Sequence, residues 1–239
     1  MMNQAAPTHA AYYKRCVEYA RQTLSSRGES HGVDHALAVH SNCQRIWFDQ
    51  DEQAEFQEQF HPSPPPVLQR LVKENQLFTP WFFISVSALL HDVCDHKYGA
   101  SNEAVDDLHI FVKDLCHENN VAQKVVLDII DNVSFSKEKK GRMDLTLSAD
   151  VMALRNVVSD ADKLEAIGKV GLERCIAYKK ELCPDDSEDN ITRDVARHCD
   201  EKLLLLLPKY FRTNGGKALG KEPHEFMVNW RANWARLTW

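Results

Sequence analysis

Histidines and aspartates stand at the ends of several apolar segments, a pattern typical of a divalent-cation site. The segment "ALLHDVCDHK" (88–97) is apolar up to Leu90 and then turns polar at His91 and Asp92. Charged groups are expensive to bury unless they are paired or bind a metal, so this pair requires partners elsewhere in the chain. Candidate partners occupy three other segments: His31, Asp34, His35 and His40; Asp160, Asp162 and Lys163; and His198.

Two imidazoles and two carboxylates form a mixed nitrogen and oxygen site, which suits Mn²⁺, Fe²⁺, Co²⁺ or Mg²⁺ better than a metal that prefers sulfur. An ion of this kind lowers the pKa of water and polarises a phosphoryl group. Each motif alone is weak, because a histidine at a helix start is usually structural and an Asp-x-Asp often caps a helix. Their order along the chain favours a metal site, and Lys97 and Lys163 beside it favour a phosphate ligand.

Composition indicates an ordinary globular protein made mostly of helices. Of the 239 residues, 44% are hydrophobic and 27% are charged, and only nine are glycine. No alternating pattern of useful length predicts strands. We therefore predict an all-α fold with a single domain over residues 1–239. The net charge of −6 without a basic block argues against a nucleic-acid polymer as partner.

Cysteine usage and the N-terminal sequence bear on the compartment. The seven cysteines are an odd number and form no CxxC motif, so free thiols in a reducing compartment are expected. The first residues lack the apolar core of a secretory signal. The longest apolar run is too short to cross a bilayer, so no membrane partner is expected. We predict a cytoplasmic protein, and a nuclear location is equally compatible.

Periodicity and breaking residues define the expected elements. Asp34 is a candidate N-cap for a helix that extends to Trp47, and Pro80 can open the helix that carries the apolar run. Residues 49–66 are acidic and then proline-rich, which predicts an exposed insertion with a short helix at most. Exposed loops are predicted at 183–190, with Asn190 as a cap, and at 212–223. The remaining helices are expected at 10–25, 67–75, 103–117, 121–131, 150–157, 160–181, 191–207 and 222–236.

The order His35, His91-Asp92 and Asp162 resembles the signature of the HD superfamily of metal-dependent phosphohydrolases. Five blocks resemble, in sequence order, those of bacterial HD-domain nucleotide pyrophosphohydrolases: "SHGVDHALAVH", "ALLHDVCDHKYG", "IIDNVSFSKEK", "VVSDADKLEAIGKVGLERCIAY" and "HCDEKLLLLL … EFMVNWRANW". The similarity covers roughly residues 10–48 and 81–238. The segment at 49–80 departs from the family, whose members connect these helices by shorter loops.

The resemblance implies an all-α HD domain with one divalent cation held by His35, His91, Asp92 and Asp162. Mn²⁺ is the expected ion, with Mg²⁺, Fe²⁺, Co²⁺ and Ni²⁺ as alternatives. Enzymes of this subgroup convert nucleoside triphosphates to the monophosphate and pyrophosphate, so the implied partner is a small nucleotide substrate. A homodimer is compatible with the resemblance.

Residues near the implied ligands are candidates for supporting roles. His31 and Asp34 are close enough in sequence to orient the His35 ring, as outer partners of metal ligands do. The family pattern places the ligand at Asp162, which leaves Asp160 as a cap or an outer partner. His198 is by default a core histidine, with an outer contact to the site as the alternative.

Lys97 and Lys163 follow the second and third ligand segments and are candidate phosphate contacts. Lys97 would also stabilise the charge of the departing phosphates. Asp95 is a candidate general base, or it forms a salt bridge with Lys97. Ser134 and Ser136 could donate hydrogen bonds to phosphate, or they form a turn at a helix end.

Two other functions fit the same residues. A phosphodiesterase or a 5′-nucleotidase would use the same metal centre with a different substrate pocket. A catalytically silent HD domain would serve as a binding module, with 49–80 as its docking segment. All four expected ligands are present, which disfavours the silent domain.

Overall fold

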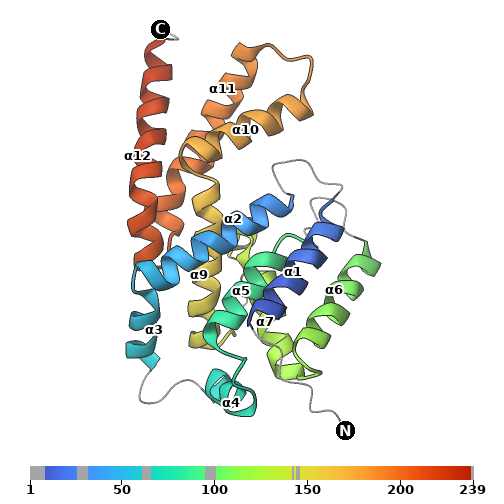
Figure 1. Ribbon diagram of the computed structural model, residues 1–239. Helices are drawn as coiled ribbons and strands as arrows, with labels where there is room; N and C mark the ends of the chain where they lie inside the picture. The colour runs from blue at the N-terminus through green and yellow to red at the C-terminus, as the bar shows by residue number, and fades with distance from the viewer. Residues whose placement is uncertain are drawn as a thin grey trace.

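The computed structural model describes residues 9–25, 32–60, 66–94, 101–141, 143 and 146–237, and within these ranges the chain is an all-α bundle without strands (Figure 1). The helices are α1 (His9–Thr23), α2 (Val33–Gln44), α3 (Glu52–Phe60), α4 (Pro66–Glu74), α5 (Pro80–Leu90), α6 (Asn102–Leu115), α7 (Asn120–Val133), α8 (Phe135–Lys139), α9 (Ala149–Glu165), α10 (Gly168–Leu182), α11 (Glu188–His198) and α12 (Asn214–Leu237). Three π-helical turns, Arg45–Asp49, Cys199–Leu203 and Leu206–Tyr210, extend these helices. The predicted all-α fold is confirmed.

The structure bears on the expected state of the cysteines and on the expected absence of a membrane span. All seven cysteines are free thiols, as predicted. Within the described ranges, none of the helices combines the length and the apolar character needed to cross a bilayer.

Helix α5 is the apolar run that the sequence placed in the core. Thr79 caps it by accepting a hydrogen bond from the Phe82 N–H at 3.2 Å, and Pro80 occupies the first turn, where its missing N–H costs nothing. Every residue from Phe82 to Leu90 is buried. The predicted helix start at Pro80 is confirmed, and α5 delivers His91 directly from the core.

Helix α9 lies at the centre of the bundle and packs against α2, α5, α7 and α12 (Figure 1). The prediction of two helices at 150–157 and 160–181 is wrong, because α9 continues through the "SDAD" motif to Glu165. Asp160 does not cap a new helix; it is fully buried inside α9. The real break lies at Ala166 and Ile167, directly before Gly168, whose φ of +77° and close approach to Pro223 favour glycine.

The predicted loop at 212–223 is also wrong, because α12 begins at Asn214 and continues through Pro223. The Gly215-Gly216 pair serves close packing instead of a turn. A Cβ at Gly216 would lie 2.7 Å from both Asp160 Oδ2 and Thr213 Oγ1. Thr213 caps the helix by accepting the Gly216 N–H at 2.9 Å.

We expect Gly216→Ala to destabilise the protein by about 1–3 kcal/mol, because the added methyl overpacks this contact. Chemical denaturation would measure the change. Lys217→Ala is the matched control, since Lys217 is exposed one position further along α12. Equal stability of the two variants would contradict the close approach.

Residues 49–59 of the predicted insertion are exposed or half-buried, and they include the short helix α3. Helix α3 packs against the π-helical turn that ends α2, with the Phe56 and Trp47 rings 5.5 Å apart. Glu52 Oε2 accepts the Gly215 N–H at 3.1 Å, and Glu55 Oε2 accepts the Asn214 side-chain amide at 2.8 Å. Acidic groups at a helix N-terminus are favourable, so α3 anchors the start of α12. Residues 61–65 lie outside the described ranges.

Three predicted boundaries differ from the structure. Helix α2 begins at Val33 after Gly32, so Asp34 is not its cap. Ser187 caps α11 by accepting the Asn190 N–H at 3.3 Å, so Asn190 is not the cap. The prediction of one helix over 191–207 differs from the structure, because the α-helix α11 ends at His198 and two π-helical turns follow it. Capping residues near a helix start compete, and the choice depends on tertiary contacts as well as residue type.

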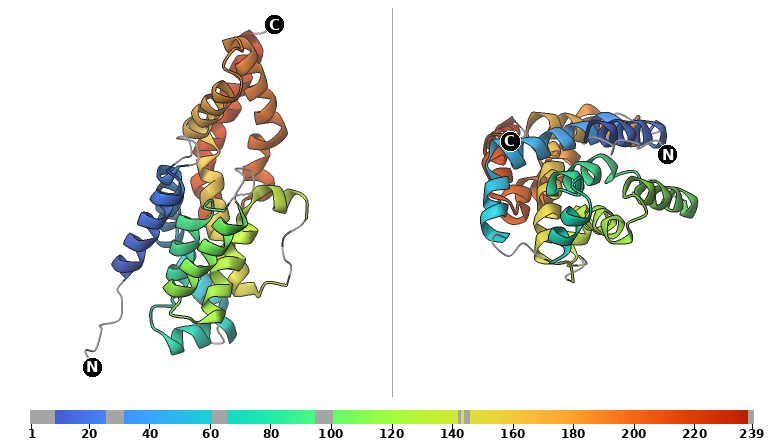
Figure 2. Two further views of the ribbon diagram at one scale, coloured as in Figure 1. Left: turned by 90° about the vertical axis from the view of Figure 1, so that its right-hand side faces the viewer. Right: turned by 60° about the horizontal axis from the view of Figure 1, so that its bottom comes forward.

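The pair α10–α11 and the C-terminal part of α12 extend beyond the other helices as an arm (Figure 2). Lys179 Nζ lies 2.8 Å from Asp194 Oδ2 and joins α10 to α11. The π-helical turns 199–203 and 206–210 lead from α11 back to the start of α12.

Candidate metal centre

Three side chains that are far apart in the sequence meet where α2, α5 and α9 pack together. His35 lies in the first turn of α2, His91 directly follows α5, and Asp162 lies one turn before the end of α9. One ligand atom from each lies within 4.8 Å of the other two. His35 Nε2 is 3.3 Å and His91 Nε2 is 3.8 Å from Asp162 Oδ1.

Asp92 lies against the same two imidazoles. Its Oδ2 is 3.6 Å from His35 Nε2, and its Oδ1 is 3.4 Å from His91 Nε2. The four residues of the expected ligand set therefore share one site. Of the two aspartates in the "SDAD" motif, Asp162 lies against the histidines, as the family pattern implied. Asp160 instead contacts Arg212 and Thr213.

The donor set fits a divalent cation. Nitrogen and oxygen ligands at about 2.0–2.2 Å from one ion lie roughly 3–3.5 Å from each other, close to the observed spacing. The two histidines are buried, with 6% and 9% of their surfaces exposed, whereas 30% of the Asp162 side chain is exposed. An ion held here would thus be enclosed on the histidine side and accessible on the Asp162 side.

A backbone carbonyl orients His91. Its Nδ1 lies 2.8 Å from the Ala88 carbonyl oxygen, an acceptor, so Nδ1 carries the proton and Nε2 faces Asp162. Metal-binding histidines are commonly held in this way. The His35 and His91 rings meet edge to face, with centroids 5.4 Å apart.

The site keeps Asp162 ionised. Burial alone would raise its pKa, but the hydrogen bond from His35 and the electrostatic interactions with the His91 and His35 rings outweigh burial and hold the pKa well below its ordinary value. An anionic carboxylate is the form that binds a cation.

Asp160 has a structural contact instead of a ligand position. Its carboxylate accepts the backbone N–H of Arg212 at 2.8 Å and that of Thr213 at 2.7 Å, and it accepts the Thr213 hydroxyl at 2.8 Å. These bonds attach the start of α12 to α9, the helix that carries Asp162. Asp160 is therefore a tertiary acceptor for the residues that precede α12, and the predicted cap of a helix at 160–181 is wrong.

Lys163, a predicted phosphate contact, is buried, with 2% of its surface exposed. Its Nζ lies 2.6 Å from Ser159 Oγ, 3.0 Å from Glu138 Oε2 and 3.7 Å from Asp160 Oδ1. A phosphate contact would require the amine to leave these partners, and this role remains a prediction.

Glu138 is the centre of a buried network that sequence reasoning missed. Besides Lys163, it pairs with Arg155 at 3.4 Å and Arg212 at 2.7 Å. Arg155 is fully buried and also donates from Nε to the Asn132 carbonyl at 2.7 Å. The sequence did contain one signal for this network. Arg155 is a charged residue between the apolar Leu154 and Val158 on the buried face of α9, and a buried charge requires a partner.

Four of the remaining candidates lie within the described residues, and three do not. Asp34 is exposed in the first turn of α2, Ser134 is half-buried between α7 and α8, and Ser136 is exposed on α8. His198 is half-buried at the end of α11. The roles predicted for these four side chains remain predictions. His31, Asp95 and Lys97 lie outside the described residues.

His40 belongs to the first histidine segment but not to the metal group. Its Nε2 lies 2.9 Å from Ser85 Oγ, and its ring packs 5.0 Å from Tyr13 and 5.4 Å from Trp81. Burial lowers the pKa of His40 from 6.5 to about 4. The folded protein therefore favours the neutral ring.

The lowered pKa of His40 predicts acid sensitivity. The neutral His40 ring contributes fully to the free energy of unfolding above pH 6.5, the pKa of the unfolded state. This contribution is lost as the pH falls from 6.5 to about 4. At ~1.4 kcal/mol per pKa unit, the loss approaches about 3 kcal/mol. We expect His40→Gln, which has no titrating ring, to flatten this acid limb in urea unfolding measured at pH 7 and pH 4.5. An unchanged slope in the variant would contradict the prediction.

No family model matches the chain, and no curated protein matches it either. Solved structures do match over nearly the whole chain. A Lactobacillus plantarum protein aligns with a TM-score of 0.61 and 24% identity, over 96% of this chain and 99% of its own. Bacillus subtilis YpgQ aligns with a TM-score of 0.61 and 20% identity, over 94% of each chain, and a second crystal structure of YpgQ contains ADP. At these identities the similarity shows the fold.

Proposed function

We propose that this protein is a metal-dependent hydrolase that converts nucleoside triphosphates to the monophosphate and pyrophosphate. The observation that carries the proposal is the convergence of His35, His91 and Asp162, with Asp92 against both imidazoles. The sequence blocks that resemble HD-domain nucleotide pyrophosphohydrolases support the substrate class. The ADP bound by the structural neighbour YpgQ is further support for a nucleotide ligand.

The proposed cation is Mn²⁺, held by His35, His91, Asp92 and Asp162. When bound, such a cation acts as a Lewis acid towards a phosphoryl oxygen and lowers the pKa of water. The chain contributes orientation and charge. The Ala88 carbonyl sets the proton position on His91, and the lowered pKa of Asp162 keeps that carboxylate anionic at neutral pH.

The geometry also restricts how a substrate approaches. The imidazoles are almost fully buried, whereas 30% of the Asp162 side chain is exposed. A phosphate group would therefore reach the centre from the Asp162 side. Excluding water from the histidine side strengthens electrostatic interactions at the reacting phosphate.

We expect the purified chain with Mn²⁺ to release pyrophosphate from deoxynucleoside or ribonucleoside triphosphates, and to lose this activity in EDTA. Phosphorus NMR distinguishes pyrophosphate from orthophosphate and triphosphate. Release of orthophosphate or triphosphate would contradict the proposed bond cleavage.

Parallel assays with dAMP and cyclic nucleotides test the other enzyme activities. Turnover of either in preference to triphosphates would favour a 5′-nucleotidase or a phosphodiesterase. Stoichiometric Mn²⁺ without turnover of any of these nucleotides would favour a binding module.

A further inference from the structure

The last turn of α9 begins with Asp162, the most exposed of the four proposed metal ligands. The last carbonyl groups of an α-helix have no N–H partner within the helix itself. In α9 the chain tightens at this end, because the Ala166 N–H bonds to the Lys163 carbonyl at 3.1 Å. The position of Asp162 therefore depends on the contacts that this turn makes with other elements.

Asn42 of α2 supplies one of these contacts. Its Nδ2 donates to Glu165 Oε1 at 2.7 Å and also to the Ala161 carbonyl at 3.4 Å. Asn42 is buried, with 7% of its surface exposed, so water competes little for these bonds. Arg45 Nη1 donates to Asn42 Oδ1 at 3.2 Å, which turns the NH₂ group of the amide towards α9. The Asn42 amide therefore joins α2 to α9 in one orientation.

Glu165 has a position that the helix alone does not favour. A carboxylate in the last turn faces the negative end of the helix dipole. The Asn42 amide satisfies this carboxylate from α2, and Arg174 of α10 donates from Nη1 to the Glu165 carbonyl at 3.2 Å. The side chain and the main chain of Glu165 are thus attached to two different helices.

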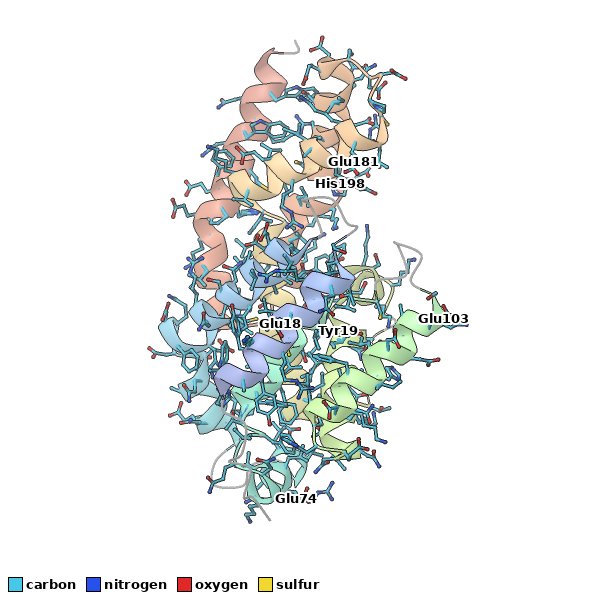
Figure 3. All side chains as sticks on the ribbon, turned by 45° about the vertical axis from the view of Figure 1, so that its right-hand side comes forward. Glu18, Tyr19, Glu74, Glu103, Glu181 and His198 are labelled. Atoms are coloured by element: carbon cyan, nitrogen blue, oxygen red, sulfur yellow. The ribbon has the colours of Figure 1, made fainter. Side chains whose placement is uncertain are left out.

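The two helices that this bond joins also contain two of the proposed ligands. Helix α2 lies across α9 and packs against it (Figures 1 and 3). Asn42 lies about two turns after His35 on α2, and Glu165 ends the turn that Asp162 begins on α9. A displacement of α2 on α9 would therefore change the 3.3 Å distance between His35 Nε2 and Asp162 Oδ1.

We propose that Asn42 and Glu165 are positioning residues that hold His35 and Asp162 at the spacing a divalent cation requires; this role rests on the metal centre of the proposed function. The bond between them fixes the last turn of α9 against α2. The contact with the Ala161 carbonyl reaches the residue directly before Asp162. Ligand distances in metal sites vary by only about 0.2 Å, so a small displacement of either helix weakens binding.

The test is calorimetric titration of the full chain with Mn²⁺ in the absence of nucleotide. We expect Asn42→Ala and Glu165→Ala each to weaken Mn²⁺ binding by about tenfold, the lower end of the effect of groups that orient metal ligands. The double variant should bind no more weakly than either single variant, because both substitutions remove the same bond. Fully additive losses in the double variant would overturn the shared bond as the cause.

Glu165→Gln distinguishes the hydrogen bond from the charge of the carboxylate. Glutamine keeps an Oε1 atom that accepts the Asn42 amide, so we expect this variant to bind Mn²⁺ as the wild type does. An affinity as low as that of Glu165→Ala would mean that negative charge near the cation matters instead, and it would overturn the positioning role.

Tyr12→Phe is the control for a general loss of stability. The buried Tyr12 hydroxyl lies 2.8 Å from His117 Nε2 and joins α1 to the turn after α6, two elements without a proposed ligand. We expect urea unfolding to show that Tyr12→Phe and Asn42→Ala are both less stable than the wild type. Mn²⁺ binding should weaken in Asn42→Ala alone. Weakened binding in both variants, or in neither, overturns the positioning role.

These results can be distinguished from a failure of the proposed function. Unchanged Mn²⁺ binding in Asn42→Ala would overturn the positioning role and leave pyrophosphate release by the wild type unaffected. Tenfold weaker binding in that variant would support the role even where the wild type releases no pyrophosphate. A wild-type protein that binds no Mn²⁺ would overturn both proposals.

Discussion

Replacement of Asp162 by asparagine is expected to eliminate measurable nucleotide hydrolysis and to weaken Mn²⁺ binding by more than ~100-fold. Loss of an outer partner of a metal ligand commonly costs 10–100-fold in affinity or activity, and Asp162 is a proposed direct ligand. Asparagine retains the shape of the side chain but removes the negative charge that faces His35 and His91 at 3.3 and 3.8 Å. Mn²⁺ titration and pyrophosphate release measure the two effects.

Asp128→Asn is the matched control for this substitution. Asp128 lies on α7 and pairs with the exposed Lys124 at 2.7 Å, so its removal is expected to leave metal binding and activity unchanged. Thermal unfolding of both variants checks that they remain folded. An Asp162→Asn protein that binds Mn²⁺ like the wild type would exclude Asp162 as a ligand.

The group of His35, His91, Asp92 and Asp162 was predictable from the order of its motifs along the chain, although each motif alone is weak. His91 and Asp92 interrupt an apolar run, and a strongly apolar helix that ends in such residues implies partners. The sequence also predicted α5 and its start, because Pro80 and the apolar length point to the same element. Convergence with His35 and Asp162 followed from the family resemblance, and the packing of α2, α5 and α9 was visible only in the structure.

The errors fall where tertiary contacts override local preference. Gly215, Gly216 and Pro223 are typical loop residues, yet they lie in α12 because the glycines allow close contact with Ile46 and Asp160. Likewise, Asp160 reads as a helix cap but is satisfied inside α9 by backbone N–H groups that are 52 and 53 positions away. Neither partner can be identified from the surrounding residues alone.

The buried network around Glu138 illustrates the same limit and has the largest expected effect on stability. Glu138 and Lys163 have 2% of their side chains exposed, and Arg155 has none. Burial raises the pKa of Glu138, but the charge and hydrogen bond of Lys163, with Arg155 and Arg212, outweigh burial and lower it. The ionised Glu138 carboxylate therefore contributes its full stabilisation at pH values above the ordinary glutamate pKa of 4.5. This stabilisation is lost as the pH falls from 4.5 to the lower pKa of Glu138 in the folded protein.

We expect Glu138→Ala to destabilise the protein by about 3–5 kcal/mol, because two buried cations would lose this carboxylate. At roughly 2–4 °C per kcal/mol for a chain of this size, the Tm should fall by about 6–20 °C. Glu173→Ala is the control: its exposed pair with Lys169 at 3.8 Å predicts a change within about 0.5 kcal/mol.

Glu138→Gln removes the charge of the side chain but keeps its shape. Its loss of stability should lie between those of Glu138→Ala and Glu173→Ala. Because Lys163 is next to Asp162, weaker Mn²⁺ binding in a folded Glu138→Gln protein would indicate that this network also positions the proposed ligand, whereas unchanged binding would limit it to stability.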